Sequence, residues 1–210
     1  MSARALERRE LIADGTVHAV GVAVGLVGAA MLIPRIVTAP SAANAIALGL
    51  YMLGLLAMLG CSAAYNMWPP SRVREWLRRF DHAAIFVMIA GTYSPLTFGH
   101  VAGSWSVRLG ILVWCVALFG VAMKLCYPRR FERLSIGLYL ALGWLGVLAI
   151  GPLVASLPLA SSILLLIGGM IYSTGVIFHL WRGLRFQNAI WHGFVLVAAG
   201  CHYAAILLVA

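Results

Sequence analysis

Long runs of apolar residues alternate with short polar breaks along the whole chain. Seven runs with almost no charge cover roughly residues 15–34, 42–67, 82–99, 106–126, 134–155, 159–181 and 188–209. Each run is near the length of about 20 apolar residues with which a helix crosses the hydrocarbon core of a membrane. The breaks hold proline and charged residues, as in Trp68-Pro69-Pro70-Ser71, and such residues end helices. The pattern predicts an all-α integral membrane protein with seven transmembrane helices.

The composition excludes a water-soluble globular chain. Of 210 residues, 63% are hydrophobic and 10% are charged, and the mean hydropathy is +0.98, whereas a soluble domain carries about 25% charged residues. Seven spans with short loops use nearly the whole length and leave no room for a soluble domain. We therefore expect a cytoplasmic N-terminal segment, residues 1–14, followed by a single transmembrane domain, residues 15–210.

The cations predict the orientation of the chain. The net charge is +9, but nucleic-acid binding needs cations gathered on one exposed face, and here they lie between apolar runs, so no nucleic-acid partner is expected. Thirteen of the 15 Lys and Arg residues fall on the side of the N-terminus, and Arg35 and Arg108 fall on the other side. The positive-inside rule then predicts an inner-membrane protein with its N-terminus in the cytoplasm and its C-terminus outside. The cytoplasmic cations also favour membrane lipids with anionic headgroups as partners.

Polar side chains inside the predicted helices mark a candidate site. Ser62 and Asn66 are one helical turn apart at the inner end of the second helix, Asp81 opens the third, and Asn188 and His192 are one turn apart at the start of the seventh. At a rise of about 1.5 Å per residue, all five lie within one or two turns of the inner membrane face. Polar groups are costly in this environment and indicate function. Three helices are therefore predicted to offer polar groups at one depth.

Three further polar residues are open to more than one interpretation. Asp14 and His18 continue a ladder of i, i+4 neighbours that begins at Glu10, and Asp14 near a helix N-terminus fits a capping role as well as a site role. His202 follows His192 by ten residues and lies about 15 Å deeper, so the two cannot share a metal ion. We interpret His202 as a core imidazole that is hydrogen-bonded to another helix.

Several stretches resemble the hemolysin III branch of the progestin and adipoQ receptor family. The early Asp14 and His18 fit the opening segment of that family, and seven spans with the N-terminus inside is its topology. The other matching stretches are Ser62-Ala63-Ala64-Tyr65-Asn66, Leu77-Arg78-Arg79-Phe80-Asp81-His82-Ala83-Ala84-Ile85-Phe86, Ile89-Ala90-Gly91-Thr92-Tyr93-Ser94-Pro95, Asn188-Ala189-Ile190-Trp191-His192 and Cys201-His202-Tyr203.

The resemblance implies a buried zinc ion near the cytoplasmic face. In the family, three histidines hold the zinc, with a serine and an aspartate beside it. Carried over to this sequence, the serine is Ser62, the aspartate is Asp81 and the last histidine is His192, while Asn66 and Asn188 stand at the positions of the other two. The resemblance also implies hydrolysis of a lipid amide, with Asp81 and Ser62 as catalytic residues and His192 as a metal ligand.

The two asparagines change the chemistry that this site predicts. Protein zinc ligands are His, Cys, Asp and Glu, whereas a carboxamide oxygen is a neutral, hard ligand that suits calcium better. His192 alone does not hold zinc tightly, so we expect the zinc site to be degraded in this chain. In a metal-free cluster, the buried Asp81 carboxylate favours a protonated His192 as its counter-charge.

Three functions remain open from the sequence. The first is a metal-deficient protein that binds or senses a lipid ligand in the bundle cavity, the second is a zinc-dependent, ceramidase-like hydrolase of a lipid amide, and the third is a membrane-lytic protein. A retinal protein is disfavoured because the one lysine, Lys124, lies at a helix end. The lack of visible inverted repeats argues against a secondary transporter.

Overall fold

The computed structural model describes residues 3–100, 104–127, 129–149 and 155–210. The described parts of the chain form helices joined by short turns, and no strand occurs among them. The helices are α1 (Ala3–Val37), α2 (Ala42–Met67), α3 (Arg72–Ser94), the π-helix η1 (Pro95–His100), α4 (Ser104–Cys126), α5 (Glu132–Trp144), the 3-10 helix η2 (Leu145–Ala149), α7 (Leu159–Leu180) and α8 (Gln187–Leu207).

The helices follow the apolar runs of the sequence. The second run coincides with α2, and the third is divided where Pro95 ends α3 and the chain continues as η1. The fifth run is helical through η2, and its residues 150–154 lie outside the described ranges. Ser41 and Ser71 cap α2 and α3, each accepting a hydrogen bond from the backbone N–H three residues later, which satisfies a donor that the first helical turn leaves free.

The first helix begins earlier than the apolar run predicts. Helix α1 is continuous from Ala3 to Val37, because Ala, Leu, Glu and Arg fill its first two turns and all favour helix. Asp14 therefore lies about three turns inside α1, and the interpretation of Asp14 as a helix cap is wrong. The predicted division of the chain at residues 14 and 15 coincides with no break in the backbone and stays a prediction.

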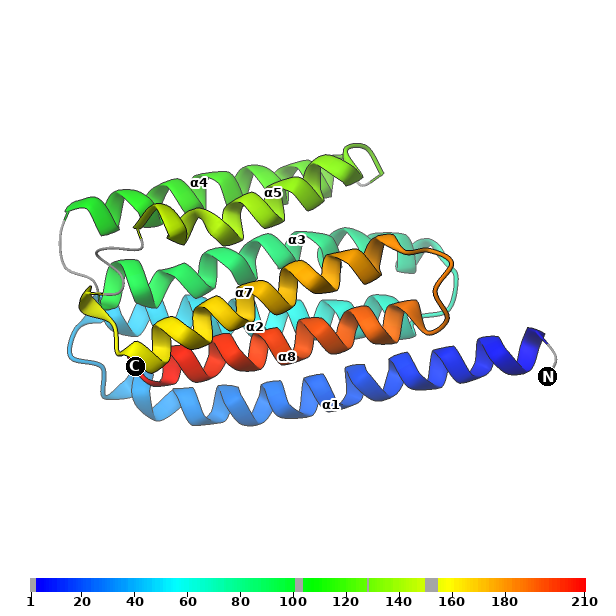
Figure 1. The fold of residues 1–210 in the computed structure, drawn as a ribbon, viewed down its shortest axis with the longest axis horizontal. Coiled ribbons are helices and arrows are strands. Elements are labelled where there is room, and N and C mark those ends of the chain that lie inside the picture. The colour runs from blue at the N-terminus through cyan, green and yellow to red at the C-terminus, as the bar shows by residue number, and fades with distance from the viewer. Residues whose placement is uncertain (1–2, 101–103, 128, 150–154) are drawn as a thin grey trace.

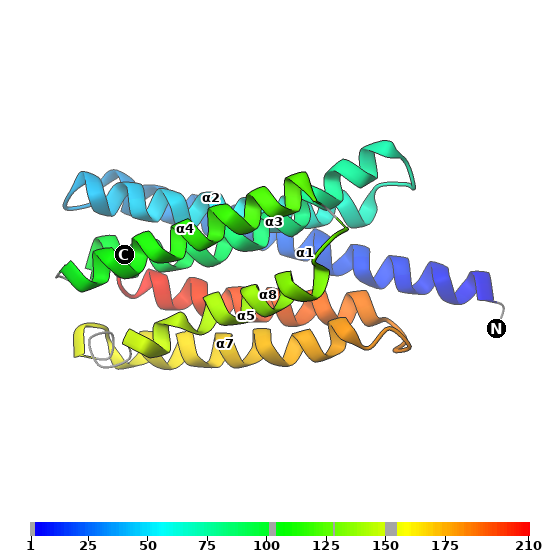
Figure 2. The same ribbon diagram turned by 90° about the horizontal axis from the view of Figure 1, so that it is seen from above.

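The helices run side by side as one elongated bundle (Figures 1 and 2). Successive connections lie at alternate ends, and the two termini lie at opposite ends of the bundle (Figure 1). Helix α2 packs against α3, α7 against α8 and α3 against α4, while α1 contacts both α2 and α8. The first and last helices are thus neighbours in space, and a polar residue on one can meet a polar residue on the other.

Five helices in the described ranges are long and apolar enough to cross a membrane: Leu6–Val37 within α1, α2, α4, α7 and α8. Helix α3 carries Arg72, Arg74, Arg78 and Arg79 in its first two turns, and α5 has only 13 residues before it tightens into η2. Large apolar side chains such as Val27, Phe119 and Ile177 are exposed on the outside of the bundle, as expected where lipid replaces water. The structure supports a membrane protein, and the count of seven spans stays a prediction.

Two kinds of close contact hold the bundle together. Helices α2 and α3 meet backbone to backbone, because a Cβ at Gly91 would lie 2.9 Å from the Leu50 carbonyl oxygen and one at Gly54 would lie 3.0 Å from the Met88 Cα. Helix α1 meets α2 through a side chain instead, since a Cβ at Gly25 would lie 2.5 Å from the Cδ1 atom of Leu59. Small residues allow this approach in membrane bundles.

Candidate functional site

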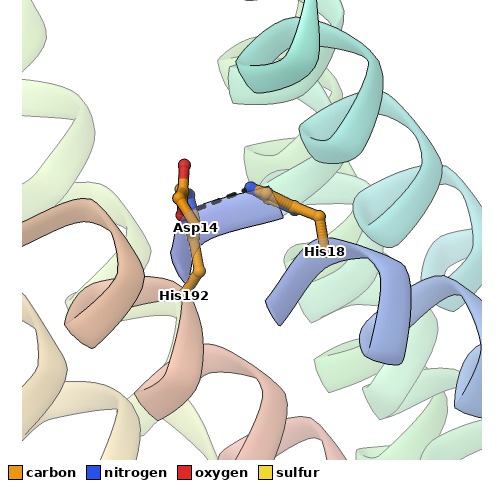
Figure 3. Close-up of side chains that lie close together, drawn as sticks. All are labelled: Asp14, His18 and His192. Atoms are coloured by element: carbon orange, nitrogen blue, oxygen red, sulfur yellow. Dashed lines mark hydrogen bonds and ion pairs between the residues drawn. The ribbon is translucent and has the colours of Figure 1, made fainter. Parts of the chain in front are cut away.

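Three polar side chains converge between the first and last helices. Asp14 and His18 lie one turn apart on α1, and His192 reaches them from the second turn of α8 (Figure 3). The Oδ1 atom of Asp14 lies 2.6 Å from Nδ1 of His192 and 3.7 Å from Nε2 of His18. The two imidazole rings are 4.4 Å apart between centroids. We call Asp14, His18 and His192 the α1–α8 group.

The α1–α8 group is shielded from the surroundings. Asp14 is 5% exposed and His18 is 7% exposed. Asp14 and His192 satisfy each other, but the Nε2 atom of His18 has no hydrogen-bond partner among the described residues. Buried polar atoms are nearly always hydrogen-bonded, and an exception asks for an explanation such as an ion or a water molecule.

A hydrogen bond beside the group fixes the two helices further. The carboxylate of Glu10, one turn before Asp14 on α1, accepts a hydrogen bond from the backbone N–H of Phe186 at 3.2 Å. Phe186 is the residue before α8, in a left-handed conformation with φ of 58°. The one-turn series Glu10, Asp14 and His18 of α1 thus lies along the start of α8. Glu10 binds the backbone of Phe186, and Asp14 binds His192.

A second polar group lies between α2 and α3. The side-chain amide of Asn66 donates to the backbone oxygen of Ser62 at 2.9 Å and lies 3.4 Å from the Ser62 hydroxyl. The Oδ2 atom of Asp81 lies 3.2 Å from Nδ1 of His82, and the His82 carbonyl accepts a hydrogen bond from Tyr139 of α5. We call Ser62, Asn66, Asp81 and His82 the α2–α3 group.

Both groups border one cavity of about 1330 Å³. His18 and His192 of the α1–α8 group and all four members of the α2–α3 group contribute to its wall, together with Asn188 and His202. The carboxylate of Asp81 also acts electrostatically on His18. The cavity therefore brings together the residues predicted from the sequence, and the structure adds α1 to the three helices expected to build the site.

The structure corrects one predicted pairing. His192 is bound by Asp14 of α1, not by Asp81 of α3, and Asp81 is paired with His82. The sequence signal for the involvement of α1 was the one-turn spacing of Glu10, Asp14 and His18. The other candidate pairs have the same spacing, so this signal did not single out α1. Nothing in the spacing indicated that α1 lies against α8.

His202 has part of the role predicted for it. Its Nε2 atom lies 3.2 Å from the Leu165 carbonyl oxygen of α7, and its ring meets that of Tyr172 edge to face at 5.4 Å. The predicted hydrogen bond of His202 to another helix is confirmed, but the side chain lies at the cavity wall and not in the core.

Two of the positions at which the family resemblance implies zinc ligands carry asparagine in this chain, Asn66 and Asn188. Asn66 turns its amide toward the turn of α2 that holds Ser62, and Asn188 offers a carboxamide one turn before His192. In the part of the chain that the structure describes, the one group of three potential metal-ligating His, Cys, Asp or Glu residues is Asp14, His18 and His192, with ligand atoms within 4.8 Å of one another.

Apolar helices around a cavity with both polar and apolar walls are typical of a helical integral membrane protein. The chain belongs to the haemolysin-III related family, whose model matches residues 9–203. It is 34% identical over 199 residues to a hemolysin-3 homolog of Bacillus subtilis, covering 95% of this chain and 93% of the relative. It is 32% identical to hemolysin-3 of Bacillus cereus, covering 95% of this chain and 91% of the relative.

A human relative extends the relationship. The monocyte to macrophage differentiation factor of Homo sapiens is 29% identical over 163 residues, which cover 75% of this chain and 67% of the relative. The resemblance to the hemolysin III branch of the progestin and adipoQ receptor family is confirmed. No solved structure matches the chain.

Proposed function

We propose that this protein is a membrane protein that binds or senses a lipid with an anionic headgroup in the cavity between its helices. The observation that carries this proposal is the cavity itself. Its volume of about 1330 Å³ exceeds the range of about 300–1,000 Å³ that is usual for small-molecule pockets. Its walls combine apolar side chains such as Met58, Ile85 and Leu196 with charged ones, which matches the two parts of a lipid.

The charges along the cavity favour an anionic headgroup. Of the described residues in its wall, six are cationic and two are carboxylates. The cations are Arg74, Arg78, Lys124, Arg129, Arg133 and Arg182, and the carboxylates are Asp81 and Glu132. Arg78 is paired with Glu132, and Arg129 lies 2.7 Å from Glu75. The surplus of positive charge lies at the ends of helices, where it can meet phosphate while the acyl chain lies among the apolar walls.

Lys124 is the cation best placed to bind a headgroup inside the cavity. Its side chain is 1% exposed and lies near both Glu132 and Arg78. A buried ammonium costs free energy unless it is paired. A phosphate that enters the cavity supplies a second negative partner to Lys124.

The experiment compares lipid binding to the purified full chain and to Lys124→Met. Native mass spectrometry measures retention of phosphatidylglycerol against phosphatidylcholine. We expect Lys124→Met to lower the preference for phosphatidylglycerol by about fivefold, because one cation near an anionic headgroup contributes about 1 kcal/mol of binding free energy. The matched control is Arg108→Gln, which removes an exposed cation from the first turns of the same helix. Equal preference in wild type and Lys124→Met overturns the proposal.

The two other functions rest on the family. The hydrolysis of a lipid amide that the family resemblance implies uses a zinc ion, and we propose that the zinc positions of the family are metal-deficient here because Asn66 and Asn188 replace two histidines. The Bacillus relatives are named hemolysins, so lysis is tested directly: purified protein in liposomes loaded with a fluorescent dye is expected to cause no leakage above that of Lys124→Met. Leakage at low protein dose restores lysis as the function.

We propose an inner-membrane location with the N-terminus in the cytoplasm. Support comes from the cations, which accumulate on the side of the N-terminus, as the positive-inside rule requires. Alkaline phosphatase, which is active only outside the cytoplasm, is expected to be active when fused after Pro40 and inactive when fused after Ser71. The reverse pattern overturns the orientation.

A further inference from the structure

We infer that a divalent transition-metal ion, with zinc as the best fit, binds between α1 and α8 to Asp14, His18 and His192. This ligand set shares only His192 with the set implied by the family resemblance. The site does not depend on the lipid proposal, because none of its three ligands belongs to the cations that favour the headgroup.

The spacing of the donor atoms suits a metal ion. Zinc bonds to nitrogen and oxygen at about 2.0–2.1 Å, so two ligands in a tetrahedral site are about 3.3 Å apart. The Asp14 oxygen is 2.6 Å from the His192 nitrogen and 3.7 Å from the His18 nitrogen. One distance is shorter and the other longer than the tetrahedral value. Small side-chain rotations that move the ligand atoms by a few tenths of an ångström bring both distances close to that value.

The unpartnered nitrogen of His18 is an independent sign of a ligand. His18 is 7% exposed, and its Nε2 atom points toward Asp14 without a hydrogen-bond partner among the described residues. Leaving a buried donor or acceptor unsatisfied costs about 1–3 kcal/mol. Figure 3 shows the same nitrogen turned toward the space between α1 and α8, and a metal ion there removes the cost.

The chemistry of the group selects a transition metal over calcium. Two imidazoles and one carboxylate form one of the usual three-ligand zinc sets, whereas calcium takes six to eight oxygen ligands. The metal displaces the proton shared by Asp14 and His192, and that proton leaves to solvent. The carboxylate of Asp81, which acts on His18 from α3, adds negative charge that favours the cation.

The site opens toward the cavity. His18 and His192 both contribute to the cavity wall, so a ligand beyond the three side chains reaches the metal from that side. The carboxamides of Asn66 and Asn188 share the same wall. The proposed metal site therefore lies at the cavity wall, with two of its three ligands on α1.

The experiment measures metal content in the purified full chain. The protein is stripped with a chelator in detergent, equilibrated with zinc chloride and desalted, and zinc per chain is determined by elemental analysis. We expect about one zinc per wild-type chain, and a zinc affinity at least about 100-fold lower in His18→Gln and Asp14→Asn, since even loss of an outer-shell partner costs 10–100-fold. The cobalt form gives a second readout, because its visible absorption reports tetrahedral coordination.

Matched controls separate this site from the family positions and from misfolding. Asn66→Ala and Asn188→Ala are expected to keep full zinc content, and so is Lys124→Met, which tests the lipid proposal alone. Zinc is expected to raise the melting temperature of the wild type and not that of His18→Gln, because binding to the native state stabilises it. The inference is overturned if the wild type retains no zinc, if His18→Gln retains as much as the wild type, or if Asn66→Ala loses it.

Discussion

The α1–α8 group and the α2–α3 group face the same cavity, but they are built in different ways. In the α1–α8 group, a carboxylate and two imidazoles from opposite ends of the chain point at one another. In the α2–α3 group, Asn66 is hydrogen-bonded to its own helix, and Asp81 forms an ion pair with the next residue, His82. Each group contains one imidazole nitrogen without a hydrogen-bond partner among the described residues, Nε2 of His18 and Nδ1 of His82, but only in the α1–α8 group do three ligand atoms from two helices converge.

The helices that carry the two groups are also held differently. Backbone contacts at Gly54 and Gly91 lock α2 to α3, whereas α1 meets α2 at Gly25 through the flexible end of Leu59. A backbone contact cannot yield, but a side chain can change its rotamer. The α2–α3 group is therefore on a rigid support, whereas α1 meets both α2 and α8 through side chains, as at Gly25 against Leu59 and Gly21 against Leu196.

The largest expected effect comes from removing the two aspartates in turn. Asp14→Ala leaves two buried histidines without their carboxylate and is expected to lower stability by about 4 kcal/mol, because breaking a buried ion pair costs about 3–5 kcal/mol. Asp81→Ala removes the ion pair between Asp81 and the half-buried His82 and is expected to lower stability by about 1 kcal/mol. Unfolding in detergent, followed by circular dichroism, measures both. Equal losses would erase the contrast between the two groups.

The second effect moves metal binding from the α1–α8 group to the positions of Asn66, Asn188 and His192, of which only Asn66 belongs to the α2–α3 group. In a His18→Gln background, adding Asn66→His and Asn188→His gives three imidazoles, His192 included, and is expected to raise zinc affinity by about 100-fold, to about one zinc per chain. Elemental analysis measures the zinc. The control is Asn66→Gln with Asn188→Gln in the same background, which adds length but no imidazole. If the histidines restore nothing, the two groups are not at one depth of the cavity.

The smallest effect tests how the helices are held. Gly91→Ala puts a methyl group 2.9 Å from a backbone oxygen and is expected to lower stability by about 2 kcal/mol, the usual cost of overpacking. Gly25→Ala meets only the movable end of Leu59 and is expected to change stability by less than about 1 kcal/mol, since alanine also favours helix. Thermal melts of the two variants provide the comparison. A larger loss at Gly25 would show that α1 is the more tightly packed helix.

Much of the fold is readable from the sequence. The apolar runs locate the helices because each helix must present apolar side chains to lipid along its whole length, and α2 coincides with its run. The start of α1 was not readable in this way, because its first turns are helical through intrinsic preference and carry charge. The assumption that the helix begins where the membrane crossing begins placed Asp14 at a helix end, so a capping role stayed open beside a site role.

The candidate site was readable only within single helices. One-turn spacing found Ser62 with Asn66 and Asp14 with His18, because such neighbours share a face of their own helix. The bond between Asp14 and His192 spans 178 positions of sequence and depends on α1 lying against α8. That adjacency follows from how the whole bundle closes, which hydrophobic periodicity does not encode.

The contact between α1 and α8 also bears on how the chain is assembled. Synthesis proceeds from the N-terminus, so α1 enters the membrane first and its partner on α8 is made last. Until then the Asp14 carboxylate has no His192 beside it, and an unpaired carboxylate on a helix that enters the membrane costs free energy. The contact between Asp14 and His192 thus forms only when the whole chain has been made. Chains that stop before α8 are expected to hold α1 loosely and to be degraded by membrane proteases.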